Sequence, residues 1–454
     1  MLPRRQFIGS IPASSLAITS LGAVPQPESK SNDKALIASP PVVQNPRAKS
    51  FGVSIAVSRL ATAWVEYGFE KDALNFTAIA SRHGLIEADD KVLHILVNHR
   101  EVLPTSNPIY YRVVAQPLIY PTPYRVQRGK QQATPVYALR LPSPDSQSIR
   151  AISINDTHEN IQTIQGLHAQ IEKLQADLLI WNGDTCNDFD AKDSPEQILL
   201  NPSNDLMQAW AATRPLLFSN GNHDVRGQRA REAMKSFASC PESADLPYNQ
   251  ALRFGPLALI TLDTGEDKPD LHPALAGTAA YEPYRESQAA WLKDALQQTA
   301  IKDAPFKIAT THIPLRGLDG QPDGTTLKSY ARYSGFGAKL WLPQLKAAGF
   351  DAVISGHTHR ARHDAPTEGM PIHQFVGGGP TPEQATLTII DATVADGKAS
   401  MQIQVTDING HILFQQAFSL RAFLDQSPSQ HKGKAKPSQN KAVLDNRLPA
   451  PSRK

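Results

Sequence analysis

The pattern of hydrophobic and polar residues changes once along the chain, near residue 148. From about residue 47 to 145, hydrophobic residues alternate with polar ones in short segments, which is typical of half-buried β-strands. The clearest such segments are residues 53–57, 61–68, 92–98 and 109–114. Their spacing predicts an all-β sandwich domain over residues 47–145.

After residue 148, short apolar segments alternate with helical patterns. Ile161, Ile164, Leu167 and Ile171 recur at helical spacing, and a second helix is expected over residues 285–297. Buried strands are expected at residues 151–154, 178–181, 216–218, 257–262, 306–310 and 352–355. Further strands are expected after residue 384, including 401–405 and 411–414. This alternation predicts an α/β domain over residues 148–420.

The two ends of the chain have a different composition. Residues 24–46 are rich in Pro, Ser, Gln and Asn, which predicts a linker, and residues 421–454 are basic and rich in Ser and Pro, which predicts a disordered tail. Arg4 and Arg5 precede an uncharged stretch that is too short to span a membrane comfortably. Residues 1–23 resemble a twin-arginine export signal, which implies a periplasmic or secreted protein without a transmembrane anchor after cleavage. The alternatives are an ordinary signal peptide or a frayed terminus.

Composition restricts the function further. The chain has 454 residues with 41% hydrophobic and 20% charged residues, which excludes a polytopic membrane protein. The formal net charge is +3, but residues 26–420 alone carry −5, because the positive charge lies at the two ends. Specific nucleic-acid binding is therefore not expected. Two cysteines, Cys186 and Cys240, exclude a disulfide-rich scaffold, and whether they pair is left open.

Five polar clusters each follow one of the expected strands. They are Asp156-Thr-His158, Gly183-Asp184-Thr-Cys-Asn187, Gly221-Asn222-His223-Asp224, His312 and Gly356-His357-Thr-His359. Because sites in open α/β sheets lie beyond the carboxyl ends of the strands, the clusters are expected to converge. We expect Asp156/His158 and His357/His359 to lie on extended backbone, where alternate side chains point the same way. The glycines are expected to allow sharp turns and close approach of the backbone.

The residue types in these clusters indicate the chemistry. Carboxylate, amide oxygen and imidazole suit Mn, Fe or Zn, and the number of candidate ligands exceeds what one four-coordinate zinc needs. The set fits two divalent or trivalent transition-metal ions. Paired ions are a recurring solution for hydrolysis of phosphate esters.

In this order, the motifs D-x-H, G-D-x-x-N, G-N-H-D, T-H and G-H-T-H resemble those of the calcineurin-like metallophosphoesterase superfamily. The resemblance covers roughly residues 150–410 and implies an αββα sandwich. The segment from Trp64 to Gly68, followed by Tyr111 to Val114, resembles the fibronectin-type-III-like domain of purple acid phosphatases. However, His158 occupies a place where those enzymes have a tyrosine ligand, so a purple ferric site is not expected.

The resemblance also implies roles for individual residues. Asp156, His158 and His359 would hold one ion, Asn222, His312 and His357 the second, and Asp184 would bridge both. His223 would stabilise the phosphate or protonate the leaving oxygen, and Asp224 would orient His223. Arg226 and Arg360, beside the third and fifth clusters, are candidate contacts for the substrate phosphate.

The resulting hypothesis is an exported dimetal phosphoesterase that hydrolyses small phosphate monoesters or diesters with a metal-activated water. One alternative is a 5′-nucleotidase-like enzyme, although that family normally carries a large C-terminal domain, and only about 30 residues follow residue 424 here. The other alternative is a non-catalytic protein that binds an envelope polymer through its β domain. For single residues, a turn role for Asp184 and a core role for the histidines are the alternatives.

Overall fold

A computed structural model describes residues 35–203, 209–237, 243–317 and 331–419. The predicted export signal, the first part of the predicted linker, the predicted tail and Cys240 lie outside these ranges. Within the described residues, no helix is both long and apolar enough to cross a membrane.

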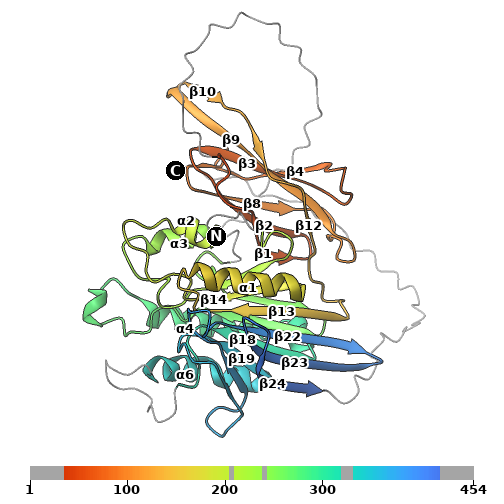
Figure 1. Ribbon diagram of the computed structural model, residues 1–454, viewed down its shortest axis with the longest axis vertical. Coiled ribbons are helices and arrows are strands. Elements are labelled where there is room, and N and C mark those ends of the chain that lie inside the picture. The colour runs from red at the N-terminus through yellow and green to blue at the C-terminus, as the bar shows by residue number, and fades with distance from the viewer. Residues whose placement is uncertain (1–34, 204–208, 238–242, 318–330, 420–454) are drawn as a thin grey trace, which may run out of the picture. The chain divides into compact units, whose positions relative to one another are not determined.

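The N-terminal region is built from antiparallel β-sheets (Figure 1). One sheet has the order β1-β2-β8, from Val42–Arg47, Ser50–Ala56 and Val92–Asn98. The other contains β10-β9-β3-β4, from Arg125–Arg128, Ile109–Thr122, Ala61–Gly68 and Phe76–Ile79. Three short strands extend it, β7 (Ala88–Asp89), β11 (Gln132–Ala133) and β12 (Tyr137–Leu139), while β5 (Ser81–Arg82) pairs with β6 (Leu85–Ile86). The predicted β-rich character is confirmed, and the fibronectin-like sandwich stays a prediction.

This region starts earlier than the linker prediction allows. Leu36 and Ile37 are buried in the same hydrophobic core as Phe51 and Val65, and β1 begins at Val42. The abundant Pro, Ser and Gln of residues 24–46 suggested a linker, but burial of a few aliphatic side chains there outweighs the polar composition.

The α/β region contains two six-stranded sheets. The first has the order β15-β14-β13-β22-β23-β24, from Leu216–Ser219, Leu178–Asn182, Ser148–Ile154, Thr386–Ala395, Lys398–Asp407 and Ile412–Ser419. The second has the order β16-β17-β18-β19-β21-β20, from Gln250–Phe254, Leu257–Leu262, Phe306–Thr311, Ala352–Ser355, His373–Val376 and Arg362–Asp364. Strands β13, β14 and β15 are parallel to one another, as are β17, β18, β19 and β21.

The hydrophobic clusters define four layers. One cluster lies between the sheets and joins Ile180 of β14 and Ile390 of β22 to Leu259 of β17 and Ile308 of β18. A second covers the outer face of the first sheet with α1 (Ile161–Leu174), and a third covers the outer face of the second sheet with α4 (Tyr281–Ala295) and α6 (Ala331–Ala347). The shorter helices are α2 (Pro195–Leu200), α3 (Ala230–Phe237), α5 (Thr299–Lys302) and the 3₁₀ turn Pro273–Leu275. The helix–sheet–sheet–helix order agrees with the expectation.

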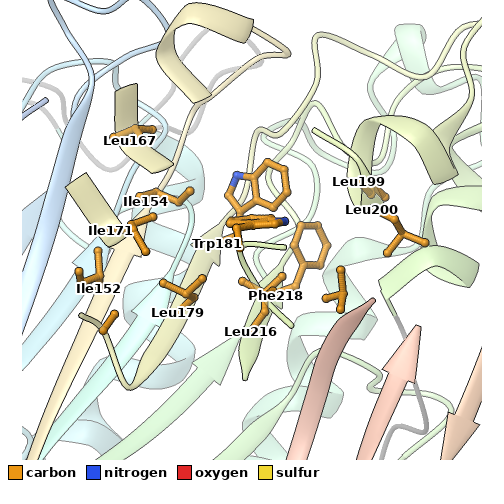
Figure 2. Close-up of a cluster of buried hydrophobic side chains, with 14 of the residues drawn as sticks. Ile152, Ile154, Leu167, Ile171, Leu179, Trp181, Leu199, Leu200, Leu216 and Phe218 are labelled. Carbon is orange, nitrogen blue, oxygen red and sulfur yellow. The ribbon is translucent and has the colours of Figure 1, made fainter. Parts of the chain in front are cut away.

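Figure 2 shows Leu167 and Ile171 of α1 in a cluster of buried side chains. Leu167 and Ile171 of α1 belong to the same buried cluster as Ile152 and Ile154 of β13. Trp181, near the end of β14, extends this cluster (Figure 2). Its ring meets the Trp210 ring edge-on at a centroid distance of 4.9 Å. The Asn160 side chain accepts a hydrogen bond from the Thr163 amide and so caps α1 at its start. The apolar side of α1 therefore fixes the helix over the strand that leads to the first polar cluster.

Candidate metal centre

The strand order brings all five polar clusters to one place. Asp156 and His158 follow β13, Asp184 follows β14, and Asn222 follows β15. The other ligand candidates, His312, His357 and His359, follow β18 and β19 of the second sheet. Since parallel strands end at the same edge of a sheet, each sheet presents its clusters along one edge.

The first group of side chains comprises Asp156, His158, Asp184 and His359, whose ligand atoms lie within 4.8 Å of one another. The Nε2 atoms of His158 and His359 are 3.1 Å apart. His359 Nε2 lies 3.2 Å from Asp156 Oδ1, and His158 Nε2 lies 3.6 Å from Asp184 Oδ2. These distances suit donors that share one ion.

The second group comprises Asp184, His312 and His357, within the same 4.8 Å limit. His312 Nε2 lies 3.2 Å from Asp184 Oδ2, and Asn222 Oδ1 lies 2.8 Å from His357 Nδ1, which adds the amide oxygen to this group. Asp184 is the one residue that belongs to both groups. This is the position that a bridging carboxylate between two ions requires.

The backbone reaches this arrangement differently from the expectation. Asp156, His158, His357 and His359 were expected on extended segments, but their φ angles are 50°, 43°, 70° and 51°. Asp184 also has a positive φ, of 51°. Left-handed backbone is disfavoured for residues with a side chain, and such strain concentrates at functional sites. The side chains converge because tight turns at the strand ends direct them inward, not because they alternate along a strand.

The glycines of the motifs have the expected role of allowing close approach. A Cβ atom on Gly221 would lie 2.1 Å from Asp184 Oδ1, and one on Gly356 would lie 2.4 Å from Asp156 Oδ2. Both distances are far below van der Waals contact. The Asp156 carboxylate beside Gly356 is also held in place by other hydrogen bonds, so it cannot move aside freely. Any side chain at either position would therefore displace a ligand candidate.

Several ligand candidates are oriented by bonds on the side away from the centre. His312 Nδ1 donates to the Asn182 carbonyl at 2.8 Å, which leaves Nε2 facing the centre. Asp156 Oδ2 accepts from the His357 amide at 2.8 Å and from the Asn155 side chain, which leaves Oδ1 inward. His312 Nε2 and Asp156 Oδ1 are both buried and make no well-aligned hydrogen bond, and another ligand candidate lies 3.2 Å from each, Asp184 Oδ2 and His359 Nε2 respectively. Since buried polar atoms are rarely left unpaired, the donor set fits bound cations.

The electrostatics of the centre point the same way. Burial lowers the pKa of His158, and burial together with His312 lowers the pKa of His357 to about 4, so both imidazoles are neutral as metal binding requires. Burial would raise the pKa of Asp184, but His312 outweighs it, and the pKa of Asp184 falls far below its usual range. In return, Asp184 offsets the effect of burial on His312 and raises the pKa of His312 to about 10. The buried carboxylate thus attracts positive charge at this point, and a bound cation would replace the proton that His312 otherwise carries.

His223 and Asp224 do not form the expected pair. Asp224 is 1% exposed, and its carboxylate accepts from the Thr185 amide at 2.9 Å, from the Thr185 hydroxyl and from the Gly221 amide at 2.7 Å. The His223 ring instead bonds through Nδ1 to the Asn187 carbonyl, with Asp188 Oδ1 at 3.6 Å. Adjacency in sequence suggested the pairing, but neighbouring residues in a turn direct their side chains apart. Asp224 therefore connects the loop of Thr185 to the loop of Gly221, and both loops carry ligand candidates. The carboxylate near the His223 ring is that of Asp188.

The two arginines have different surroundings. Arg226 forms ion pairs with Glu266 and Asp267, each at 2.6 Å, so its charge is already balanced by protein carboxylates. Burial would lower the pKa of Arg226, but these hydrogen bonds and charges outweigh burial and raise it. Arg226 is therefore poorly placed for substrate phosphate. Arg360 is exposed beside His359, and its side chain forms no ion pair within the described residues.

The sequence reading missed Asn182, which ties the strand ends together. Its side-chain amide donates to the carbonyls of Thr311 at 3.1 Å and Ile354 at 3.2 Å, so one residue of β14 links β18 and β19 of the other sheet. Its carbonyl also orients His312. The signal available in the sequence was an Asn directly after the apolar residues 178–181, where a buried amide needs partners.

One comparison with known proteins matches the part of the chain that contains the candidate metal centre. The model of the calcineurin-like phosphoesterase family matches residues 149–361, which contain every ligand candidate. No curated protein matches the chain significantly in sequence.

Three solved structures illustrate the similarities found. The phosphoesterase Yfce from E. coli is 14% identical, covering 59% of this chain and 98% of its own, with a TM-score of 0.27. TT1561 of Thermus thermophilus is 12% identical over 57% and 99%, with a TM-score of 0.33. Phosphopantetheinyl hydrolase from Mycobacterium tuberculosis is 12% identical over 51% and 91%, with a TM-score of 0.29. On the family match and the paired Asp/His groups, residues 149–361 are a calcineurin-like metallophosphoesterase domain.

Proposed function

We propose that the domain hydrolyses phosphate monoesters or diesters with two bound transition-metal ions. The observation that carries this proposal is the pair of ligand groups that share Asp184, each with a buried donor atom whose near neighbours include another ligand candidate, Asp156 Oδ1 beside His359 Nε2 in one and His312 Nε2 beside Asp184 Oδ2 in the other. The first ion would be held by Asp156, His158, Asp184 and His359, and the second by Asp184, Asn222, His312 and His357. When bound, the ions would supply a nucleophilic water at neutral pH and neutralise phosphoryl charge.

The residues of the chain have separate roles in this proposal. Asp184 fixes the relation between the two ligand groups, and its Oδ1 accepts from the His223 amide at 2.9 Å, which places the next loop against the centre. His223 is the candidate for stabilising the phosphate or protonating the leaving oxygen. Because its Nδ1 is bonded to the Asn187 carbonyl, its Nε2 is the nitrogen left to face a substrate. The centroids of the His158 and His223 rings are 4.8 Å apart. The His223 ring therefore lies at the edge of the candidate metal centre.

The proposal is tested with the purified chain and two chromogenic substrates. With Mn²⁺ or Zn²⁺ added, hydrolysis of p-nitrophenyl phosphate, of bis-p-nitrophenyl phosphate or of both is expected, and metal chelation should abolish it. The ratio of the two rates distinguishes monoester from diester preference, and 5′-AMP tests the nucleotidase alternative. Absence of hydrolysis of all three with every metal and pH would favour a binding protein without activity.

We also propose that the chain is exported by the twin-arginine route. The support is the sequence of residues 3–9 and the uncharged stretch behind it. Export of folded proteins suits a domain whose ligands come from five separate strand ends, since metal can be acquired before transport. Replacing Arg4 and Arg5 with lysine should leave the protein in the cytoplasmic fraction, and unchanged localisation would refute the route.

A further inference from the structure

The β9–β10 hairpin extends beyond the sheet that carries it. β9 pairs with β3 from Tyr110 to Pro117, and after that point its partner is β10, through Ile119 opposite Gln127 and Thr122 opposite Arg125. Residues 119–128 are thus a two-stranded ribbon, visible at the β10 end of β9 in Figure 1. We call residues 119–128 the ribbon.

The ribbon exposes large apolar side chains on both faces. Ile119, Tyr120 and Val126 are each 51% exposed, and Tyr124, at the turn, is fully exposed. Successive residues of a strand point to opposite faces, so Ile119 and Tyr120 lie on different faces. A two-stranded ribbon with no apolar cover is marginally stable in water, so this amount of exposed apolar surface indicates an interaction.

All charged side chains on and near the ribbon are positive. Arg125, Arg128 and Lys130 lie on or directly after β10, and the chain has no Asp or Glu from residue 102 to 144. None of these three cations forms an ion pair within the described part of the chain, whereas Arg112, near the start of β9, is paired with Glu66 at 2.7 Å. The unpaired cations fit an anionic partner.

From these features we propose that the ribbon inserts into the surface of a bilayer rich in anionic phospholipid. A flat polymer or protein would cover one face of the ribbon, whereas the interfacial region of a bilayer surrounds both faces. Tyrosine favours that region, and Arg128 and Lys130, set back from the turn, would meet the lipid phosphates, which the long side chain of Arg125 could also reach. Arg128 is the fourth residue after Tyr124, about 13 Å along the strand. Interfacial segments bury their apolar groups about 5–10 Å deep.

The same features disfavour deeper insertion and self-association. The outer edge of β10 carries backbone groups that water or lipid headgroups must satisfy, so the ribbon cannot enter the hydrocarbon core. Two copies that paired edge to edge would bring Arg125 and Arg128 against their own equivalents, and edge cations of this kind oppose such pairing.

The test is binding of the full chain to vesicles that contain phosphatidylcholine with about 30% phosphatidylglycerol, compared with phosphatidylcholine alone. The triple variant Arg125→Gln, Arg128→Gln, Lys130→Gln should bind the anionic vesicles on the order of one hundred-fold more weakly, at about five-fold per cation. The variant Tyr120→Ser, Tyr124→Ser should bind about ten-fold more weakly. Because the basic tail is present in every variant, differences among variants report the ribbon.

Two control variants match these changes. Lys173→Gln, Lys293→Gln, Lys302→Gln removes three exposed charges elsewhere, and Leu271→Ser removes a side chain that is 93% exposed. Neither control should change binding by more than about two-fold.

Insertion is measured with Tyr124→Trp. Fluorescence of the new tryptophan should be quenched by bromine on the lipid acyl chains, while the five native tryptophans give the background. Three outcomes would overturn the proposal. They are equal vesicle binding by ribbon and control variants, absence of quenching at position 124, and a loss of binding to soluble polyphosphate as large as the loss to vesicles. A ribbon-dependent dimer in solution would identify a second copy as the occupant instead.

Discussion

Replacing Asp224 distinguishes a structural carboxylate from a catalytic one. In Asp224→Ala, the amides of Thr185 and Gly221 lose their acceptor inside the protein, and the Thr185 hydroxyl loses one as well. Thr185 follows Asp184, and Gly221 precedes Asn222. The substitution therefore loosens both the shared ligand and a ligand of the second group.

The magnitude follows from the number of bonds lost. A buried donor left without a partner costs about 1–3 kcal/mol, so the two amides and the hydroxyl set an upper range of several kcal/mol. Part of this is offset, because burial next to Asp184 raises the pKa of Asp224 to about 6 and its charge is therefore unfavourable at neutral pH. We expect a net loss of about 2–4 kcal/mol, which lowers Tm by about 5–15 °C in a domain of this size. Metal affinity should fall about 10–100-fold.

The assay measures Tm by calorimetry, bound metal by elemental analysis and hydrolysis of p-nitrophenyl phosphate on the same preparations. The matched control is Asp188→Asn, since Asp188 is half-exposed and lies 3.6 Å from His223 Nδ1. The Tm of Asp188→Asn should change by no more than is usual for a surface substitution, and the variant should retain its metals. It should hydrolyse p-nitrophenyl phosphate more slowly than the wild type. If Asp224→Ala kept wild-type Tm and metal content and lost only turnover, Asp224 would act on His223, and the reasoning above would be refuted.

Three further predictions concern other groups. His223→Ala should lower turnover about 10²–10⁴-fold while both metals stay bound, and loss of metal would contradict its role as a non-ligand. Asp184→Asn should weaken both metal sites, so unchanged metal content would refute the shared carboxylate. Hydrogen bonds from Arg229 and Lys91 lower the pKa of Glu232 from 4.5 to about 2, so its stabilisation is complete above the unfolded value and is lost as pH falls through about 2. The Tm difference between wild type and Glu232→Gln should therefore be present at pH 7 and vanish toward pH 2, and a difference that persisted there would exclude this ion pair as its source.

Much of the fold could be predicted because its signals are local. Hydrophobic periodicity predicted α1 and the strands β3, β8 and β17 with nearly the observed bounds. It did not predict where the β-rich region begins, because burial of Leu36 and Ile37 depends on a core assembled from distant strands. It also missed α6, whose interior Pro343 and Gly337 interrupt a helical pattern that packing of Trp341 stabilises.

By itself, the sequence determined which side chains compose the candidate metal centre, since their types and their places after apolar strands are written in the motifs. Tertiary structure alone decided how they meet. The left-handed turns at Asp156 and His357 and the linking amide of Asn182 arise only when strands of two sheets end at one point. For the same reason Asp224 bonds to the loops of Thr185 and Gly221 and not to its neighbour His223. A side chain's partners depend on the direction of the backbone in three dimensions, and sequence adjacency does not specify that direction.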